Sequence, residues 1–542
     1  MSNTQRRLIV AALALAALAW FKLAPHRSGD DAKPTASATP SAQSADADPT
    51  TAAPDAITRQ VGKIGFTPCT LAPAFGTQSV EALCGSFEVL ENRAAPAGRK
   101  IRLAVAWLPA KGEAEPDPMV MLAGGPGQSA LETFPTIANA FADLRKHRNV
   151  LLVDQRGTGG SNKLRCKDED EDKNGDKADS STGTGDASVP SPASLETDLA
   201  NARAATERCV AQLSKIADLR FYSTTDAIQD LDEVRAAIDA DKLNLMGVSY
   251  GTRVAQQYAK RYPGHVRTIT IDGIAPNSLV LGNTMARTLE SSLDRQFARC
   301  AKDPKCESKL GDPRSNLNTL MQTLRTAPPK VTFRDAITGE SRTETLTTGH
   351  IAGVARLFAY IPQIAGLLPL ELNEAAHGRY EPLMALANLL RTTVGDQITD
   401  GMQFSVICTE DAGELKVEPA DVGSLLGTDL VTAMQTACAV WPHGERPAGF
   451  RAPLTGNLPV LILSGEFDPV TPPAFGDEVL KSLGNARHLV VRGQGHNVLP
   501  VGCVPKLFTR FVETADAKSL DVHCLDKVPY AAPFTGFYGW EP

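Results

Sequence analysis

The stretch NLMGVSYGTR, residues 244–253, decides how the rest of the sequence has to be interpreted. An apolar run leads directly into residues 247–251, which read G-x-S-x-G with Ser249 at the centre. This pattern is typical of a sharp strand-to-helix turn that carries a nucleophilic serine. Because so short a pattern also occurs by chance in ordinary glycine-flanked turns, the neighbouring elements must distinguish the two interpretations.

Short apolar runs and amphipathic patterns alternate along the chain on both sides of this stretch. Ser223-Thr224-Thr225-Asp226 predicts the capped start of a helix, and VAQQYAKRY after Ser249 predicts another. Such alternation predicts an α/β fold with a mostly parallel sheet and helices on both faces. The predicted strands are IRLAVAWLP (101–109), MVMLAG (119–124), NVLLVDQ (149–155), LNLMGV (243–248), TITIDG (268–273), LPVLILSG (458–465) and HLVVRG (488–493).

Composition limits the classes of protein that the chain can represent. Of 542 residues, 42% are hydrophobic and 22% are charged, which is typical of a globular protein with a sizeable core. The net charge of −7 argues against a nucleic-acid partner. The length predicts several domains, or one large domain with an insertion.

The N-terminus predicts export from the cytoplasm. Arg6 and Arg7 precede an apolar run, residues 8–21, that resembles the core of a secretory signal. The cleavage site is imperfect, so residues 1–24 are predicted to be either a signal peptide or an N-terminal membrane anchor. Residues 25–57, rich in Ala, Ser, Thr, Pro and Asp, are predicted to form a disordered linker. The protein is therefore expected to be periplasmic or secreted, with anchoring at the outer face of the inner membrane as the alternative.

The cysteines support the same compartment. An even count of ten in an exported chain predicts disulfides, although spacing does not determine their connectivity. Pairing of nearest neighbours would give five local loops. Paired Cys-x-x-Cys motifs are absent from the sequence, so no metal site is expected. The candidates are Cys69, Cys84, Cys166, Cys209, Cys300, Cys306, Cys408, Cys438, Cys503 and Cys524.

The distance from Ser249 to the late strands predicts an insertion. Residues 277–452 exceed what the alternating core needs, and patterns such as GHIAGVARLFAYI and PLMALANLLR are helical. We expect this segment to form a helical cap domain, inserted between core parts 58–276 and 453–542. A biased acidic stretch from Lys167 to about Ser194 is expected to be a surface loop, because it lacks the ligand spacing of a calcium loop.

Two residues late in the chain are candidates to activate Ser249. A serine hydroxyl is a weak nucleophile, so it needs a base, and the base needs an orienting acid. Asp468 and His496 each follow a predicted strand, in the order Ser, Asp, His that α/β-hydrolases use. Because the ends of parallel strands converge, these three are expected to meet as nucleophile, orienting acid and general acid–base.

Other residues compete for these roles. His488 lies at the start of a strand, whereas His496 follows the last strand and is flanked by glycine. Glu466 and Asp272 are alternative acids, and Asp272 ends the strand after the nucleophile strand, where some hydrolases carry their acid. Asp468 is preferred, because the following Thr471-Pro472 is typical of a helix start that would fix its loop.

An acyl-transfer site also needs backbone N–H groups for the developing oxyanion. The residue after the nucleophile, Tyr250, is expected to supply one such group. The other is expected from the glycine-rich loop AGGPGQS, residues 123–129. A phosphate-binding loop is excluded, because no Lys-Ser/Thr follows the glycines.

Six motifs resemble those of a known peptidase family, and the resemblance runs from about Cys69 to the C-terminus. The family includes proline iminopeptidases and bacterial tripeptidyl aminopeptidases, and VICTED and CAVWP resemble the tripeptidyl aminopeptidase branch. The motifs are GGPG (124–127), DQRGTGGS (154–161), GVSYGT (247–252), DGIAP (272–276), GEFDPVTP (465–472) and GQGH (493–496).

This resemblance implies an α/β-hydrolase core with a helical cap, no metal and no cofactor. It further implies that the substrates are peptides with a free N-terminus, from which short units are removed. Ser249, Asp468 and His496 would form the triad, and Gly125 and Tyr250 the oxyanion hole.

The sequence departs from the family pattern before and after the glycine motif. Ala123 replaces a histidine of proline iminopeptidases, which argues against strict proline specificity. Gln128 replaces a common glycine and could narrow the acyl site. In the family that the chain resembles, acidic residues in or near the cap hold the free amino group of the substrate. The resemblance therefore makes Glu410 and Asp411 of CTED candidates for this role, and a charged amine in a closed pocket needs a carboxylate partner. The alternative for these two is a solvated pair of surface acids.

The leading interpretation is an exported serine aminopeptidase that releases di- or tripeptides. A secreted carboxylesterase or lipase-like hydrolase is the alternative, since the same chemistry cleaves esters and amides. A non-catalytic binding protein on the same fold would be expected to have lost part of the triad, and this sequence retains all three residues.

Overall fold

The structure, a computed structural model, describes residues 59–73, 76–166, 192–394 and 397–536. The predicted signal or anchor (1–24), the predicted linker (25–57) and nearly all of the predicted acidic loop lie outside these residues. Within the described ranges, no helix combines the length and the apolar character needed to cross a membrane.

A ten-stranded sheet forms the centre of the fold, in the order β1-β2-β3-β4-β6-β5-β7-β8-β11-β12. Neighbouring strands are parallel from β6 through β5, β7, β8 and β11 to β12. The strands β1, β2, β3 and β4 join that part of the sheet through antiparallel pairs. All seven predicted strands are present, and the predicted α/β class is confirmed. The bounds are β1 Arg59–Val61, β2 Ile64–Leu71, β3 Val80–Leu90, β4 Lys100–Leu108, β5 Met119–Leu122, β6 Val150–Val153, β7 Leu243–Val248, β8 Val266–Asp272, β11 Val460–Gly465 and β12 Ala486–Val491.

The first three strands were not predicted from the sequence. β2 and β3 alternate between buried and more exposed positions, so neither presents a continuous apolar run. β2 also contains Pro68, which argues against a strand when only the sequence is read. A disulfide between Cys69 and Cys84 joins the two strands.

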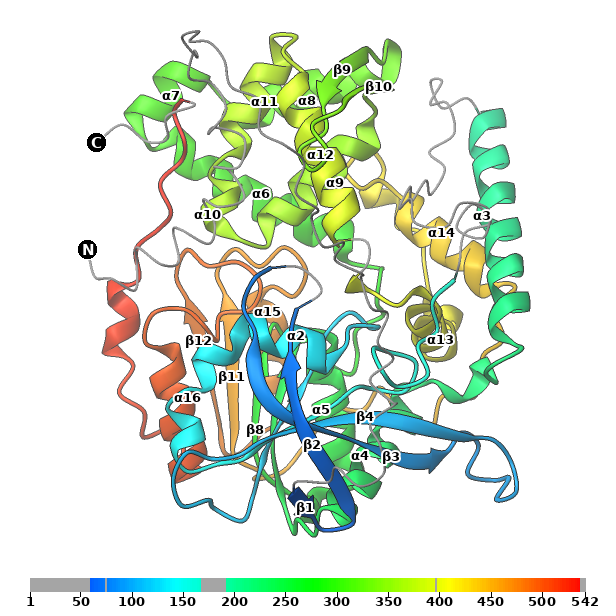
Figure 1. Ribbon diagram of the computed structural model, residues 1–542. Helices are drawn as coiled ribbons and strands as arrows, with labels where there is room; N and C mark the ends of the chain where they lie inside the picture. The colour runs from blue at the N-terminus through cyan, green and yellow to red at the C-terminus, as the bar shows by residue number, and fades with distance from the viewer. Residues whose placement is uncertain (1–58, 74–75, 167–191, 395–396, 537–542) are drawn as a thin grey trace, which may run out of the picture. The chain divides into compact units, whose positions relative to one another are not determined.

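Helices cover both faces of the sheet (Figure 1). Alternate residues of β11 illustrate the division: Val460 and Ile462 pack with α4, α5 and α15, whereas Leu461 and Leu463 pack with α2 and α16. The parallel strands are therefore buried on both sides. The helix bounds are α2 Ala130–Ile137, α3 Pro192–Leu213, α4 Thr224–Ala237, α5 Tyr250–Arg261, α15 Pro473–Leu480 and α16 Val504–Thr514. Short 3-10 turns are η1 Ala138–Phe141, η2 Leu144–Lys146, η3 Leu219–Phe221, η4 Pro263–His265, η6 Ala412–Glu414, η7 Pro419–Asp421 and η8 His523–Lys527.

The start of α4 was predicted correctly. Ser223 caps the helix, and its side chain and that of Asp226 form a reciprocal capping box. This cap matters for the site, because Thr224, the first residue of α4, contacts two candidate site residues described below.

Residues 273–459 connect the adjacent strands β8 and β11, and we call them the intervening segment. Figure 1 shows α6 and α8 to α12 grouped together above the sheet, around a hydrophobic cluster of their own. The segment is mostly helical, as predicted, but the hairpin of β9 and β10 was not predicted. The cap boundaries 277–452 stay a prediction. The bounds are α6 Met285–Ala301, α7 Pro304–Leu310, α8 Pro313–Thr326, β9 Lys330–Arg334, β10 Ser341–Thr345, α9 Thr348–Ala359, α10 Pro362–Ala365, α11 Leu368–Ala376, α12 Glu381–Val394, α13 Asp400–Glu410 and α14 Asp429–Cys438.

The end of the intervening segment packs differently from its beginning. Met402, Val406 and Ile407 of α13 belong to the hydrophobic cluster that also contains strand residues and α5. α14 packs against α3, and the disulfide Cys408–Cys438 ties α13 to α14. α13 is thus part of the main core, which brings its C-terminal end close to α5.

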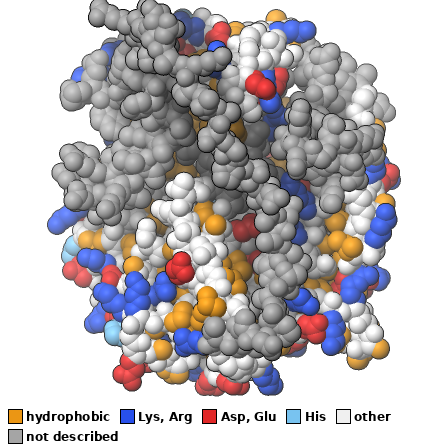
Figure 2. Space-filling view, in the orientation of Figure 1, with side chains coloured by type: hydrophobic (Ala, Val, Ile, Leu, Met, Phe, Trp, Pro, Cys, Tyr) orange, Lys and Arg blue, Asp and Glu red, His pale blue; other side chains and the backbone are white. Residues whose placement is uncertain are grey.

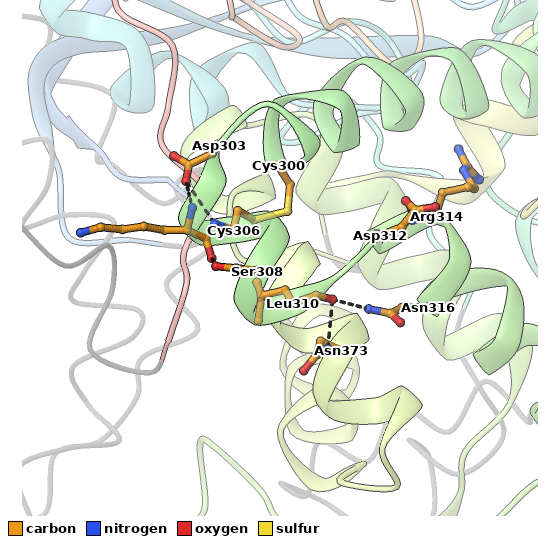
Figure 3. Close-up of a disulfide and its surroundings, with 10 residues drawn as sticks. Cys300, Asp303, Cys306, Ser308, Leu310, Asp312, Arg314, Asn316 and Asn373 are labelled. Atoms are coloured by element: carbon orange, nitrogen blue, oxygen red, sulfur yellow. Dashed lines mark hydrogen bonds between the residues drawn. A yellow bond between two sulfur atoms is a disulfide. The ribbon is translucent and has the colours of Figure 1, made fainter.

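All ten candidate cysteines form disulfides, and every bond joins nearest neighbours in the sequence. Figure 3 shows Cys300–Cys306, which links α6 to α7 where Asp303 caps the start of α7. In the same view, Asn316 and Asn373 both donate to the carbonyl of Leu310 at the end of α7. The five bonds are Cys69–Cys84, Cys166–Cys209, Cys300–Cys306, Cys408–Cys438 and Cys503–Cys524.

Candidate active site

Ser249 occupies the sharp turn between β7 and α5. Its φ is 55°, in the left-handed region that non-glycine residues rarely adopt. A Cβ on Gly247 would lie 2.5 Å from the carbonyl oxygen of Gly251, so the turn needs glycine there. The Ser249 N–H donates to the carbonyl of Asp272 at 2.9 Å, which fixes the turn against the end of β8. The G-x-S-x-G pattern is therefore explained by the geometry of this turn.

Asp468 and His496 form a buried hydrogen-bonded pair. Asp468 follows β11 and His496 follows β12, and Oδ2 of Asp468 lies 2.7 Å from Nδ1 of His496. The other carboxylate oxygen accepts the N–H groups of Val470 and Thr471 at 2.9 and 2.8 Å. This arrangement fixes the imidazole with Nε2 as its remaining nitrogen, which is what a general base needs.

The pair changes the acidity of the imidazole. Burial lowers the pKa of His496, but the charge of Asp468 and its hydrogen bond raise it, and the net result is a raised pKa. A raised pKa means that His496 accepts a proton more readily than an ordinary histidine does. The raised pKa therefore suits His496 to the role of a general base, which must hold a proton during the reaction.

Thr471 is a site residue that the sequence interpretation missed. Its hydroxyl donates to Oδ2 of Asp468 at 2.9 Å and lies 3.2 Å from Nδ1 of His496. The sequence signal was the threonine three residues after Asp468, which was interpreted only as part of a helix start. The helix, α15, begins at Pro473, and the Thr471 side chain instead orients the carboxylate.

The end of β8 brings Ser249 and His496 to the same place. Ser249 is bonded to the backbone of Asp272, and a Cβ on Gly273 would lie 2.6 Å from Cε1 of His496. None of the hydrogen bonds that the described residues make joins the Ser249 hydroxyl to His496. In enzymes without bound substrate this contact is often long, so its absence does not argue against the pair.

The three competing residues are engaged elsewhere. Asp272 accepts the N–H groups of Val498 and Leu499 at 3.0 and 2.7 Å, and burial raises its pKa to about 6. It therefore holds the loop that follows the histidine. Glu466 accepts the N–H of Gly493, and His488 contacts Ser464 and Asp477.

Gly125 and Tyr250, the predicted oxyanion donors, line one pocket together with Ser249. Gly125 has a φ of +104°, which requires glycine, and a Cβ on its neighbour Gly124 would lie 3.0 Å from Cβ of Ser249. Tyr250 is the first residue of α5, so its N–H has no acceptor within the helix. Both N–H groups therefore belong to backbone beside the serine.

The pocket beside Ser249 is otherwise mainly apolar. Among the described residues that line it there is no aspartate or glutamate, and those with a hydroxyl are Ser249, Tyr250, Thr284 and Thr471. The lining residues are Gly125, Ser249, Tyr250, Ala275, Leu279, Leu281, Gly282, Thr284, Met285, Val470 and Thr471.

Glu410 and Asp411, the predicted amine-binding residues, lie at the end of α13 and are not among the lining residues. Their side chains are fully buried, so the alternative of a solvated surface pair is wrong. Asp411 contacts Arg253 at 3.2 Å and Arg451 at 2.6 Å, and Glu410 lies 3.5 Å from Arg253. Sequence reasoning did not foresee these arginines. Binding of a substrate amine stays a prediction.

Tyr360, at the corner between α9 and α10, covers the histidine from the intervening segment. Its carbonyl accepts the N–H of His496 at 2.9 Å, and the two rings meet edge to face with centroids 5.2 Å apart. The pair of Asp468 and His496 is thereby enclosed between the sheet and the intervening segment.

Within the described ranges, no group of three or more His, Cys, Asp or Glu residues is placed to hold a metal ion. Figure 2 shows basic and acidic side chains interspersed over the lower half of the face in view.

Two protein families match parts of the chain. Residues 117–345 match the alpha/beta hydrolase fold family, and residues 423–524 match the family described as TAP-like protein. The first match contains Ser249 and the second contains Asp468 and His496. Among solved structures, a proline iminopeptidase from Mycobacterium smegmatis is similar at 13% identity and a TM-score of 0.39, covering 80% of this chain and 98% of that one.

Characterised relatives cover most of the chain. A tripeptidyl aminopeptidase of Streptomyces coelicolor is 32% identical over 487 residues, covering 83% of this chain and 84% of that protein. The tripeptidyl aminopeptidase of Streptomyces lividans is 30% identical with the same coverage. The serine protease Hip1 of Mycobacterium tuberculosis is 26% identical, covering 83% of this chain and 88% of that protein. The chain belongs to the tripeptidyl-aminopeptidase-like family of serine hydrolases with the α/β-hydrolase fold.

Proposed function

We propose that this protein is an exported serine aminopeptidase that releases di- or tripeptides from the N-termini of peptides. The observation that carries the proposal is the 2.7 Å hydrogen bond between Asp468 and His496, which follow neighbouring strands of the sheet. Ser249 also follows a strand of this sheet and lines the pocket. Similarity to the Streptomyces tripeptidyl aminopeptidases supports a peptide substrate. Five disulfides and the basic, apolar N-terminus support an oxidising compartment.

The proposed reaction proceeds through an acyl-enzyme. Oγ of Ser249 attacks the scissile carbonyl while Nε2 of His496 takes the hydroxyl proton, and Asp468 stabilises the imidazolium. The N–H groups of Gly125 and Tyr250 stabilise the oxyanion of the tetrahedral intermediate. When the C–N bond breaks, His496 gives its proton to the departing amine. Water then attacks the ester by the same route, which releases the short peptide and restores Ser249.

We propose that the intervening segment, with predicted boundaries 277–452, acts as a cap on this site. Tyr360 packs directly on His496, and Leu279, Leu281 and Met285 line the pocket. Segments of this kind limit which substrates reach the serine. Release of short units rather than internal cleavage would follow from such a limit.

A carboxylesterase is the second candidate, and one observation favours it. Among the described residues that line the pocket, none carries a carboxylate that could bind a substrate amine. A carboxylesterase of Mycobacterium tuberculosis is also 26% identical over 433 residues of the alignment. The residues proposed for catalysis would hydrolyse an ester by the same steps.

A small fluorogenic panel distinguishes these functions. It contains a free-amine tripeptide amide, the same peptide with an acetylated N-terminus, and a short acyl ester, with Ser249→Ala as the control. Cleavage of the free-amine peptide alone, lost in Ser249→Ala, is the expected result. Ester turnover without peptide cleavage would replace the peptidase with the esterase. If no substrate shows turnover that depends on Ser249, the catalytic assignment is wrong.

A further inference from the structure

One wall of the pocket is formed by residues 275–282, which begin three residues after the end of β8, and we call them the pocket wall. Ala275, Leu279 and Leu281 contribute its apolar surface to the pocket. The pocket wall contains neither helix nor strand. Its shape therefore depends on the groups that hold it from outside.

The helix behind Ser249 holds the beginning of the pocket wall. The hydroxyl of Thr252 accepts the N–H of Ala275 at 2.8 Å, and the amide of Gln256 donates to the Ala275 carbonyl at 3.0 Å. Both side chains are buried on α5. The first residue of the pocket wall is thus fixed relative to Ser249.

Two arginines hold the middle of the pocket wall. Arg253, also on α5, donates to the carbonyl of Leu279. Arg451 donates to the same carbonyl at 2.6 Å and to the carbonyl of Asn277 at 3.3 Å. Two guanidinium groups therefore donate to the carbonyl of Leu279, a residue that lines the pocket.

These arginines are themselves held by Asp411. Each of its carboxylate oxygens accepts a hydrogen bond from one guanidinium group. Oδ1 accepts from Arg451 at 2.6 Å, and Oδ2 accepts from Arg253 at 3.2 Å. The side chains of Arg253 and Asp411 have no exposed surface, and that of Arg451 is 20% exposed. Two cations this close repel one another when buried, and Asp411 is the carboxylate that bridges them. Glu410 lies 3.5 Å from Arg253 and Glu414 lies 3.3 Å from Arg451, but neither of these contacts joins the two arginines.

We infer that Asp411, through Arg253 and Arg451, fixes the pocket wall and thereby determines which acyl-side residue of the substrate fits beside Ser249. The inference rests on the proposed function, because the pocket receives the acyl side only if Ser249 is the nucleophile. On this inference Asp411 is a positioning residue that does not touch the substrate, which is the alternative to the amine-binding role predicted from the sequence. Since the wall is apolar, the side chain it accepts is uncharged and apolar.

Glu410 is a natural internal control for this inference. It is the neighbour of Asp411 and is equally buried, but its Oε1 accepts the N–H of Thr224 at 2.7 Å. Its contact with Arg253 is 3.5 Å long, and it makes no side-chain bond to Arg451. Burial raises the pKa of Glu410 to about 7, so an uncharged amide at this position changes the local charge less than at Asp411.

The test compares substrates that differ in one side chain. A series of free-amine tripeptide amides carries Ala, Val, Leu or Phe at the residue whose carbonyl is attacked, and each has an N-acetylated twin. We would measure kcat/KM for the wild type, Asp411→Asn, Arg451→Gln and Glu410→Gln. Active-site labelling with a fluorophosphonate corrects each rate for the fraction of folded enzyme.

We expect Asp411→Asn and Arg451→Gln to change the ratio of kcat/KM between the Phe and Ala substrates by about tenfold or more, a size typical of pocket discrimination. Glu410→Gln should keep the wild-type ratio. The preference for free-amine over acetylated substrate should stay unchanged in all three variants.

Two results would overturn the inference. A uniform loss of kcat/KM across the series, with unchanged ratios, would show that the cluster supports only the fold. Loss of the preference for the free amine in Asp411→Asn would assign the carboxylate to amine binding instead. If Asp411→Asn does not fold, Arg451→Gln still tests the inference. The Arg451 side chain is 20% exposed, so its replacement should disturb the fold less than a change at Asp411.

The same variants separate this inference from the proposed function. If the wild type cleaves esters but no peptide, the aminopeptidase proposal fails, and the acyl pocket is then tested with acetyl, butyryl and octanoyl esters. An altered ratio between acyl lengths in Asp411→Asn would still support the inference, whereas an unchanged ratio would overturn it. A wild type without any Ser249-dependent turnover would overturn both.

Discussion

Two buried aspartates flank the same pocket and differ in what binds them. Asp468 and Asp411 are 3% and 0% exposed, and each binds partners through both carboxylate oxygens. Asp468 faces a histidine, whose charge appears and disappears near neutral pH. Asp411 faces two arginines, whose charges are permanent. The difference teaches that the partner, rather than burial, decides whether a carboxylate serves proton transfer or fixed geometry.

The largest effect is expected from Asp468→Asn. An amide at this position can no longer accept the Nδ1–H of His496 as a carboxylate does, so the imidazole loses its orientation and its stabilisation when charged. We expect kcat to fall by about 10⁴ with little change in unfolding temperature. Steady-state kinetics on the best substrate and a thermal melt measure the two quantities. A loss smaller than tenfold would remove Asp468 from the proposed triad.

The opposite behaviour is expected from Asp411→Ala. Removal of this carboxylate leaves the two guanidiniums with only the longer contacts to Glu410, 3.5 Å from Arg253, and Glu414, 3.3 Å from Arg451. Breaking a buried pair in this way costs up to about 3–5 kcal/mol of unfolding free energy. Urea unfolding followed by fluorescence measures the change. The control is Asp143→Ala, which removes an exposed pair with Lys146 and should change stability by less than about 1 kcal/mol. Equal effects of the two variants would contradict the role given to burial.

The pH profile sharpens the comparison on the catalytic side. His496 must be neutral to accept a proton, and its pKa is raised above the ordinary 6.5. We therefore expect kcat/KM to fall about tenfold per pH unit on the acid side, with its midpoint above 6.5. In Asp468→Asn the charge and the hydrogen bond that chiefly raise the pKa of His496 are gone, whereas burial and the weaker influence of the Asp272 charge remain, so the midpoint should move to lower pH. A midpoint that does not respond to this variant would show that another group controls the profile.

The smallest effect is expected from Glu410→Gln. Because the folded-state pKa of Glu410 is raised to about 7, the wild type loses stability as pH rises from about 4.5 through 7. The amide has no proton to lose and acquires no buried charge, so the stability of the variant relative to the wild type should increase between pH 6 and pH 8. At pH 6 we expect a difference of about 1 kcal/mol or less. Urea unfolding at both pH values measures the change, and a variant that weakens with rising pH would contradict the raised pKa.

The parts of the fold that could be predicted from sequence are those with strong one-dimensional signals. All six residues of β11 are buried, and such a run predicts a central parallel strand. β2 alternates and contains a proline, so its place in the sheet depends on β3 and not on its own pattern. The hairpin of β9 and β10 was also missed, because neither strand presents a continuous buried apolar run.

The same distinction applies to the site. Convergence of strand ends predicted that Asp468 and His496 would lie together, and a hydrogen bond joins them. Nothing comparable predicts the cluster at Asp411, because its partners lie 158 and 40 residues away and arginines are normally exposed. Cys408 was the available hint, since its bond to Cys438 implies that the end of α13 is buried. Pairings set by packing between distant segments need the three-dimensional structure.

The order of the disulfides has a consequence for how the protein is made. Each cysteine is bonded to the next one along the chain, over separations of 15, 43, 6, 30 and 21 residues. A chain that crosses a membrane from its N-terminus presents its thiols in just this order. An oxidase that joins thiols as they emerge would therefore produce the native set directly, and no bond would have to be broken and re-formed. If the protein is exported as proposed, its maturation should accordingly need an oxidant but no disulfide isomerase.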